Sequence, residues 1–475
     1  MLGQSEYGLY SLAASVIAYL TVLDLGFGNA IIRYTAKFRA EGKQIEQQYM
    51  FGMFLVLYTI IGIIAAISGG ILSLNANLLF SAKMTLDEIE RAQVLLWLMT
   101  FNLAITFPLS VWSSIMSAYE RFVFKKMLNI IRSILNPIVM VVLLTLGYKA
   151  VAMVVVTTLF NVVTLLIDWW YCKHYLRIKV RFGNFDWGLL KEISIYSLWI
   201  FLNVIMDRIY WSTGQFVLGI YRGAVAIAVY AVAIHLQGMY MSFSSAISGV
   251  FLPKVTAMVT KQNSEREVSN LFIRTGRVQY IIMSFILCSF FVFGRPFIHI
   301  WAGVEYDDAY IICLLFFIPL TIPLIQNLGI TILQARNQMK FRSVVYIIIA
   351  VGSLGISIPL ARLYGGIGCA IGTSLALVFG QIIVMNIYYH KKQHIDIIRF
   401  WKEILKMSIA PVFFTAFVYL IIECLHINLC NISNFIVGAT IFTLLYILLF
   451  WHFSMNKSER DLFLVPIKKT ISKLS

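Results

Sequence analysis

The stretch Leu23–Tyr34 reads L-D-L-G-F-G-N-A-I-I-R-Y and places an acidic residue near the end of a long apolar run. Asp24 comes nine residues before Arg33, and Gly26 and Gly28 follow it closely. A carboxylate inside a membrane is costly, so its presence in an apolar, helix-length run indicates a candidate functional site. Glycines beside it allow the helix to bend or another backbone to approach. The basic residues that follow predict that this helix ends at the cytoplasmic face.

The composition predicts an integral membrane protein. Of the 475 residues, 60% are hydrophobic and 13% are charged, whereas soluble domains carry about 25% charged residues. The apolar runs have the length of membrane helices rather than of barrel strands, so the predicted fold class is all-α. The net charge of +16 arises in short loops between these runs. Membrane orientation therefore explains it, and we expect no nucleic-acid partner.

The motifs in the chain do not indicate an enzyme. No P-loop, GxSxG, HExxH or paired-cysteine metal motif occurs in the sequence. We therefore expect no catalytic residues, no cofactor and no metal site. Any work that the protein performs would draw on an ion gradient or on substrate flow, not on ATP bound to this chain.

We predict 13 membrane-spanning helices. The apolar runs that define them lie near 8–32, 50–74, 93–117, 129–147, 150–171, 193–219, 223–250, 278–300, 309–334, 343–363, 366–389, 407–426 and 433–453. No segment between them is long enough for a soluble domain.

The distribution of basic residues predicts the orientation of these helices. When each Lys and Arg is assigned to alternate sides, 31 of the 38 fall on one side, six on the other, and Arg208 lies within a helix. The basic-rich side includes Lys254–Arg277, Lys391–Lys406 and the tail after Lys457. By the positive-inside rule this side, with the C-terminus, is cytoplasmic. Thirteen helices then place Met1 outside, unless a further helix precedes it.

An internal repeat favours such a preceding helix. Ser117–Phe124 resembles Gln334–Phe341 at an offset of 217 residues, and Gly8–Ala13 resembles Ala228–Ala233 at an offset of 220. The first five predicted helices thus match the five that begin near residue 223. The helix at 193–219 has no counterpart unless one came before Met1.

The repeat predicts a plan of 14 helices, of which 13 are visible in the chain. Two pseudo-symmetric bundles form a parallel repeat about an axis along the membrane normal, and two C-terminal helices follow. The predicted parts are an N-lobe at 1–180, a C-lobe at 181–395, and two extra helices with a basic tail at 396–475. A repeat with short loops is typical of a transporter.

Three stretches resemble the Wzx-type polysaccharide flippases. They are E-Y-G-L-Y-S-L at Glu6–Leu12, the stretch Leu23–Tyr34, and A-Y-E-R-F at Ala118–Phe122. These flippases belong to the MOP transporter superfamily, together with the lipid II flippase MurJ and the MATE drug exporters. The resemblance covers essentially the whole chain. Relatives usually have a complete helix before the E-Y-G-L-Y-type stretch, at which this chain begins.

The resemblance implies a function in the bacterial inner membrane. The implied activity moves an undecaprenyl-pyrophosphate-linked oligosaccharide to the outer face by alternating access, for synthesis of O-antigen, capsule or exopolysaccharide. The implied partners are this substrate, membrane lipids, H⁺ or Na⁺, a polysaccharide polymerase and a chain-length regulator. Physical chemistry agrees in kind, because a polar headgroup needs a hydrated cavity and a pyrophosphate needs cations. The alternative is a MATE-like cation-coupled antiporter of drugs or metabolites. A polymerase or ligase of the same pathway would be expected to present a sizeable outer loop, which is not found here.

The predicted helix at 193–219 carries a broad polar face. At roughly 100° per residue, about half of its circumference is covered by Asn203, Asp207, Arg208, Trp211, Ser212 and Gln215. As a cavity wall, this face would let Arg208 contact pyrophosphate or sugar and Trp211 stack on a sugar ring. Alternatively, Arg208 forms a buried ion pair with Asp24 or Asp207 that only joins helices.

Other ionisable residues have two interpretations each. Asp24 is a candidate proton or cation relay, or half of that structural ion pair. Arg33 is a candidate cavity residue, or an interfacial anchor. His235 is a candidate proton-responsive group, although such a histidine is often only hydrogen-bonded within a bundle. Asp168 lies near the inner end of its helix, where it is a candidate functional group or a side chain that reaches the membrane interface.

Overall fold

The computed structural model describes residues 3–81, 83–183, 186–248, 258, 265–336, 338–461 and 464. Helices account for nearly all of these ranges, and no strand occurs within them. Contacts between helices divide the chain into two units. The first comprises Met1–Ala231 and Ala361–Gly365, and the second comprises Val232–Leu360 and Gly366–Ser475. The predicted all-α membrane fold is confirmed.

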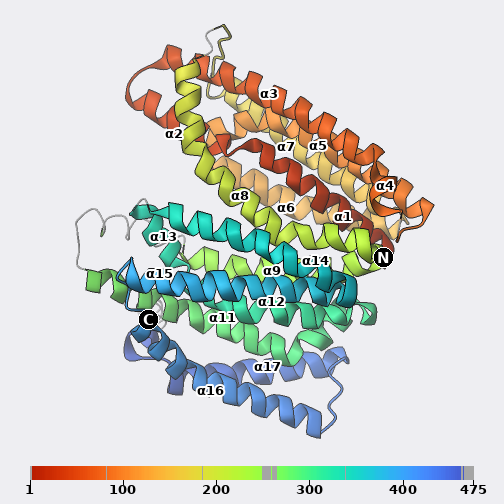
Figure 1. The fold of residues 1–475 in the computed structure, drawn as a ribbon, viewed down its shortest axis with the longest axis vertical. Coiled ribbons are helices and arrows are strands. Elements are labelled where there is room, and N and C mark those ends of the chain that lie inside the picture. The colour runs from red at the N-terminus through yellow and green to blue at the C-terminus, as the bar shows by residue number, and fades with distance from the viewer. Residues whose placement is uncertain are drawn as a thin grey trace, which may run out of the picture. The chain divides into compact units, whose positions relative to one another are not determined.

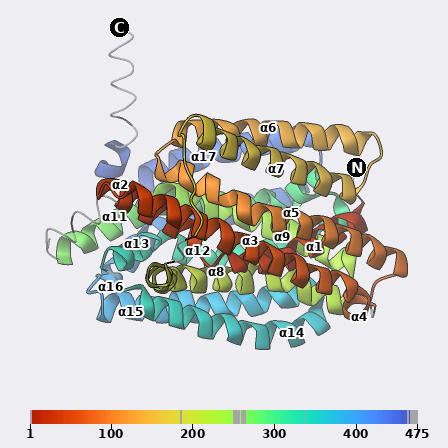
Figure 2. The same ribbon diagram turned by 90° about the horizontal axis from the view of Figure 1, so that it is seen from above.

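The first unit is a helix bundle centred on α5 (Figure 1). Its elements are α1 (Gln4–Leu20), η1 (Thr21–Asp24), α2 (Phe27–Ala40), α3 (Gln44–Leu74), α4 (Ala76–Phe80), α5 (Leu86–Ala118), α6 (Phe122–Thr145), α7 (Ala150–His174), α8 (Trp187–Tyr221) and the first turns of α9 (Ala224–Ser248). Helix α5 packs on α3, α7, α1 and α2, and α8 packs on α1 and α2. Figure 2 shows α3 and α5 running side by side. With 31 residues in α3 and 33 in α5, each is longer than the about 20 residues that span a membrane.

The second unit is built around α11. Its elements after α9 are α11 (Glu265–Trp301), η3 (Val304–Tyr306), α12 (Asp308–Ile325), α13 (Leu328–Ala335), α14 (Met339–Leu377), η4 (Val378–Val384), α15 (Met385–Lys391), α16 (Ile397–Cys424), α17 (Ile432–Leu449) and η5 (Phe450–Ser454). Helix α11 packs on α12, α16 and α17. The two predicted C-terminal helices thus appear as α16 and α17, and both pack against this unit's central helix.

The thirteen predicted helices all have counterparts. Among the described residues, eleven segments are long and apolar enough to cross a membrane. One of these, Met339–Lys391, turns at Gly365, where φ is 61° and ψ is −134°, and therefore accounts for two predicted helices. Helix α8, which carries Asp207 and Arg208, accounts for the remaining one.

The contact units differ from the predicted lobes at α8, at the first turns of α9 and at residues 361–365. The prediction groups residues 181–221 with the second lobe, because the repeat matches this helix to one before Met1. In the structure, α8 packs on α1 and α2 within the first unit. The repeat describes sequence correspondence, whereas the units describe packing. The division into repeats therefore stays a prediction.

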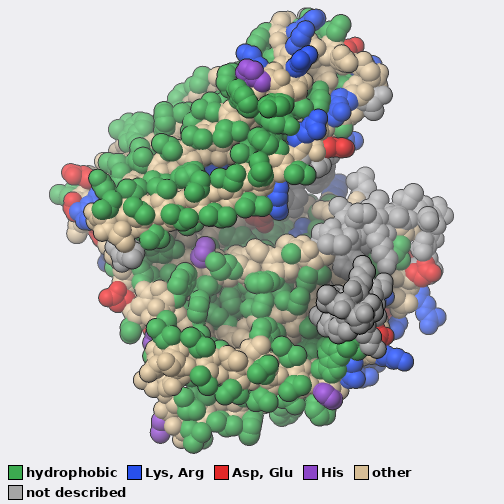
Figure 3. Space-filling view, turned by 180° about the vertical axis from the view of Figure 1, so that it is seen from behind, with side chains coloured by type: hydrophobic (Ala, Val, Ile, Leu, Met, Phe, Trp, Pro, Cys, Tyr) green, Lys and Arg blue, Asp and Glu red, His purple; other side chains and the backbone are tan. Residues whose placement is uncertain are grey.

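The surface agrees with helices surrounded by lipid. Large apolar side chains are exposed along many helices, among them Ile63, Ile67, Phe413, Phe417 and Leu420. Figure 3 shows apolar side chains covering most of this face, with Lys and Arg gathered mainly toward its edges. In water such a surface would be unfavourable, and in a bilayer it is the expected one.

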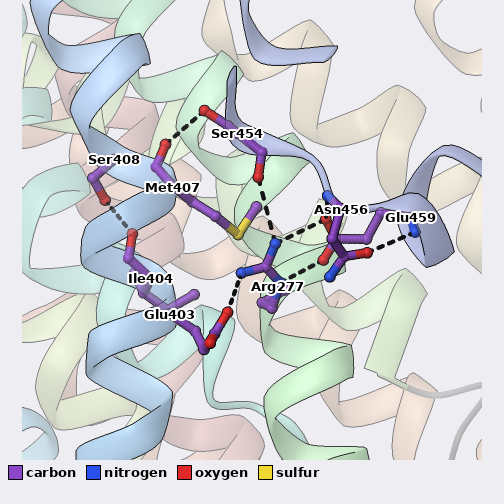
Figure 4. Close-up of polar contacts among 8 residues, drawn as sticks. All are labelled: Arg277, Glu403, Ile404, Met407, Ser408, Ser454, Asn456 and Glu459. Atoms are coloured by element: carbon purple, nitrogen blue, oxygen red, sulfur yellow. Dashed lines mark hydrogen bonds and ion pairs between the residues drawn. The ribbon is translucent and has the colours of Figure 1, made fainter. Parts of the chain in front are cut away.

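An ionic cluster fastens the C-terminal helices to α11 (Figure 4). Arg277 donates from Nε and Nη2 to the carboxylate of Glu459, at 2.5 and 3.0 Å, and from Nη1 to Glu403 at 2.7 Å. Its Nη2 also faces the carbonyl of Ser454. The sequence placed Arg277 on the basic-rich side, just before the predicted helix at 278–300. In the structure it lies inside α11, which begins at Glu265, so the predicted helix start is wrong and the predicted side stays a prediction.

Candidate functional site

The first membrane-spanning segment is broken beside Asp24. After α1, the residues Thr21–Asp24 form one 3₁₀ turn, and Leu25 and Gly26 then have φ values of 52° and 76° before α2 begins. Glycine adopts this left-handed conformation readily, but for leucine it costs roughly 1–2 kcal/mol. The surrounding packing must therefore hold the break. The sequence predicted bending at the glycines, and the left-handed leucine was not foreseen.

Asp24 has one hydrogen-bond donor from a neighbouring helix. The hydroxyl of Tyr58, in α3, donates to Asp24 Oδ1 at 2.7 Å. Tyr58 is fully buried and lies between the rings of Phe54 and Phe107, while Asp24 is half-buried. A hydrogen bond to a carboxylate is stronger than one between neutral groups. The break thus presents an oriented carboxylate near the middle of the span Gln4–Arg39.

The predicted ion pair between Arg208 and Asp24 is not formed. The carboxylate of Asp24 accepts its hydrogen bond from Tyr58, and Arg208 Nε has no hydrogen-bond partner in the part of the chain that the structure describes. The rotation of α8 about its axis decides which residues it presents to α1, and helical periodicity does not fix that rotation.

The polar face of α8 is partly buried. Ser212 and Gln215 are 8% and 9% exposed, Arg208 and Trp211 are half-buried, and Asp207 is exposed. The side chain of Asn203 lies outside the described residues. A hydrogen bond between Tyr19 and Thr213 ties α8 to α1. This helix therefore presents polar groups both to its neighbours and to the surface of the first unit.

Arg33 and His235 lie in different units. Arg33 is exposed on α2, and its guanidinium lies 5.9 Å from the centre of the Tyr34 ring. His235 is exposed on the part of α9 that belongs to the second unit, and its ring stacks on Trp301 at 6.4 Å. The structure thus brings Asp24, Arg33 and the α8 face into one unit and leaves His235 in the other.

A polar network around Arg132 was missed by the sequence analysis. Arg132 lies ten residues inside α6, which is about 15 Å along the helix. Its Nη1 donates to Asn161 Oδ1 at 3.2 Å, and Asn161 Nδ2 donates to Asn102 Oδ1 and Thr106 Oγ1 at 2.8 and 2.6 Å. In the described chain no carboxylate pairs with this cation. The sequence did contain a signal, because Arg132 lies one turn inside the predicted apolar helix at 129–147. The assignment of basic residues to the two membrane sides grouped it with the preceding loop.

Asp168 is buried, so the interpretation in which it reaches the membrane interface is wrong. It is 2% exposed, and its Oδ1 has no hydrogen-bond partner among the described residues. Lys125 lies near it but donates to the Ser113 carbonyl and to Ser117 Oγ, at 3.2 and 2.8 Å. Helices α5, α6 and α7 enclose this group, so the first unit holds a buried carboxylate here as well as the half-buried Asp24.

The fold and these buried charged groups define a multi-pass membrane protein with ionisable side chains inside its helices. Ionisable side chains inside membrane helices are rare and mark ion or substrate pathways. The chain is similar to the lipid II flippase MurJ in an inward closed conformation, with a TM-score of 0.68 and 16% identity over 94% of this chain and 97% of that one. It is also similar to an inward-facing MATE family multidrug transporter of the MOP superfamily, with a TM-score of 0.60 and 18% identity over 80% and 93%.

The sequence comparisons identify the family. The chain belongs to the polysaccharide biosynthesis protein family, whose model matches residues 1–259. A Shigella flexneri protein named "Putative O-antigen transporter" is 20% identical over 398 residues, which are 82% of this chain and 90% of that protein. The expected polysaccharide family is confirmed, and the likeness to the MurJ and MATE structures extends to the fold.

Proposed function

We propose that this chain moves undecaprenyl-pyrophosphate-linked oligosaccharides across the bacterial inner membrane by alternating access. The family membership and the MurJ-like fold support a lipid-linked substrate, and the name of the Shigella relative supports an O-antigen-type glycan. In this proposal the basic-rich helix ends and the C-terminus face the cytoplasm. A polymerase and a chain-length regulator act on the product outside.

The observation that carries the proposal is the broken first span with Asp24 at the break. A span that only anchors a protein needs neither a break nor a carboxylate, and both are costly in a membrane. The hydrogen bond from Tyr58 keeps the carboxylate oriented. We assign Asp24 the role of a proton or sodium relay, because a half-buried acid can change its charge as the protein changes conformation.

Cations of the same unit would meet the pyrophosphate. Arg132 and Arg208 lie within helices and have no carboxylate partner in the described chain. Arginine binds phosphate oxygens through planar, paired N–H donors. Trp211 is half-buried three residues along α8 from Arg208, a spacing that suits a sugar ring next to a phosphate.

The test is complementation of a cell that lacks its own flippase. Surface glycan would be measured for the intact chain and for Asp24→Asn, Tyr58→Phe and Arg132→Gln, with the amount of each protein in the membrane measured in parallel. Glu90→Gln is the matched control, because it neutralises an exposed acid at the start of α5. We expect the intact chain and the control to restore glycan and Asp24→Asn to fail at normal abundance. Normal glycan with Asp24→Asn would contradict the assigned site.

The second candidate is a cation-coupled antiporter of drugs or metabolites, which the MATE-like fold favours. The same strains distinguish the two. Drug resistance without glycan would support the antiporter, and glycan without drug resistance would support the flippase.

A further inference from the structure

A cavity at one end of the first unit has no part in the site described above. It has a volume of about 330 Å³, at the lower end of the roughly 300–1,000 Å³ that small-molecule sites occupy. Its walls are the loop between α2 and α3, the first turns of α3, the end of α5 and the segment after α7. All of these elements belong to one unit, so the cavity is complete within it.

The walls of this cavity are basic. Arg39, Arg177 and Lys179 line it, and no carboxylate occurs among the described residues that do so. The neighbouring acid Glu41 is engaged by Lys43 at 2.8 Å. Three cations around one small space repel each other, and an anion placed between them would relieve that repulsion.

One of these cations is held in place by its neighbours. The Arg39 guanidinium lies 4.2 Å from the centre of the Tyr119 ring and donates to the carbonyl of Ala118 at 3.2 Å. Arg177 and Lys179 are exposed, and neither forms an ion pair in the described chain. Arg177 also has a φ of 49°, in the left-handed region that glycine favours at helix ends. The cavity thus retains an arginine where the backbone alone would favour glycine.

The remaining wall offers hydrogen bonds to a ligand that carries hydroxyl groups. Gln47 is 4% exposed and donates to the Tyr119 hydroxyl at 3.3 Å. Gln48 lines the cavity too, and its Oε1 is buried without a hydrogen-bond partner in the described chain. A buried acceptor without a donor is unfavourable. A ligand hydroxyl, or a water held by the ligand, would satisfy it.

The segment after α7 is fixed against α3, so the cavity has a defined shape. The backbone N–H of Arg181 donates to the carbonyl of Gln48 at 3.1 Å. One turn further along α3, a Cβ on Gly52 would lie 2.1 Å from the carbonyl oxygen of Arg181, so only glycine permits this close approach. The cationic residues 177 and 179 are therefore carried on a segment with little freedom to leave.

We propose that this cavity binds the headgroup of an anionic glycerophospholipid of the phosphatidylglycerol type. The shared chemistry is a phosphate ester that carries free hydroxyl groups: the phosphate meets the three cations, and the glycerol hydroxyls meet the amides. The cavity lies at the basic-rich helix ends, where lipid headgroups of the cytoplasmic leaflet lie in the proposed orientation, and basic pockets at this depth bind anionic lipids. A headgroup of several sugars is larger than this space, so the lipid-linked substrate fits it less well.

The experiment uses the intact protein purified in nanodiscs of phosphatidylcholine. Phosphatidylglycerol, phosphatidic acid, or soluble glycerol phosphate would be added, and the bound ligand measured by native mass spectrometry and by the thermal unfolding temperature. The test variant is Arg177→Gln with Lys179→Gln. The matched control is Lys402→Gln with Lys406→Gln, which removes two exposed cations from the start of α16. Unfolding without added lipid shows whether each variant folds.

We expect phosphatidylglycerol to bind and to raise the unfolding temperature of the intact protein and of the control. Since each cation near an anionic headgroup changes affinity by roughly fivefold, the test variant should bind about 25-fold more weakly. Gln48→Met should reduce the preference for phosphatidylglycerol over phosphatidic acid while leaving the cations intact. This variant keeps the proposal testable if the double variant does not fold.

Two results would overturn the proposal. Equal loss of lipid in the test and control variants would show a general charge effect, and binding of glycerol phosphate without phosphatidylglycerol would show a site for a soluble ligand. The assay involves no transport, so its result does not depend on whether the chain is a flippase. Equally, failure of lipid binding at this cavity would leave the proposed flippase function untouched.

Discussion

Replacing Arg277 by methionine should detach the end of the chain from α11. The guanidinium is buried, and one of its partners, Glu459, has a side chain that is only 2% exposed. Removing one member of a buried ion pair costs about 3–5 kcal/mol, because the other charge is left without compensation. The second partner, Glu403, is 34% exposed, so its loss adds at most about 1 kcal/mol. Glu459 keeps one hydrogen bond, from the Asn456 N–H at 2.9 Å, which places the expected loss near the lower end of that range.

The measurement is the free energy of unfolding in detergent, together with hydrogen exchange of residues 450–461. We expect Arg277→Met to lose about 3 kcal/mol and to increase exchange selectively in this segment. Adding Glu459→Met should recover part of the loss, because an apolar pair of similar volume leaves no buried charge. A loss below about 1 kcal/mol, or a double variant that is less stable than the single one, would refute the reasoning.

Three further predictions follow from named contacts. Glu6→Gln should lower the unfolding free energy by at most about 1 kcal/mol, because its partner Arg91 is 38% exposed and keeps its ion pair with Asp87 at 2.6 Å; a loss of several kcal/mol would contradict this. The hydrogen-bonded guanidinium of Arg295 lowers the pKa of Asp307. The stability that Asp307 adds is therefore complete above about pH 4 and is lost as the pH falls through the lowered pKa. Asp307→Asn should make the unfolding free energy depend less on pH in that range, and an equal pH dependence of the variant and the parent chain would contradict this prediction. Asp168→Asn removes a buried charge whose Oδ1 has no hydrogen-bond partner in the described chain. We therefore expect the unfolding free energy of this variant to equal or exceed that of the parent chain. A clearly lower unfolding free energy in a denaturant titration would show that Asp168 is part of an ion pair.

The sequence was sufficient for the helices and for the fold class. Apolar runs of membrane length and the alternation of basic loops depend on local composition, which a single sequence contains in full. The break at Leu25 was harder to predict. Gly26 indicated a bend, but a left-handed leucine is unfavourable by itself and persists only because the adjoining η1 turn packs against α3 and α8. Tertiary packing decided this conformation, and no local pattern contains it.

The candidate site could be predicted in part. Asp24 was recognised because a charge in an apolar run is conspicuous, but its partner Tyr58 was not, since tyrosine in a membrane helix has no distinctive pattern. The expected partner Arg208 was chosen by charge alone. The identity of the neighbour depends on how α8 is rotated against α1, and the hydroxyl of Tyr58 reaches the carboxylate from α3 instead. Charge complementarity predicts that a partner exists more reliably than it predicts which one.

The most informative errors share one physical cause. Hydropathy detects only the part of a helix that lies in hydrocarbon, so the helices predicted from 278 and 407 actually begin at Glu265 and Ile397. The extra turns are amphipathic and carry Arg277 and Glu403, which the prediction placed in two separate loops. If Arg277 and Glu403 are both assigned to loops in water, an ion pair between the first turns of two helices cannot be predicted. Extending every predicted helix through its flanking amphipathic turns would have placed both residues on helices at the same side of the membrane. Their opposite charges would then have predicted an ion pair between them.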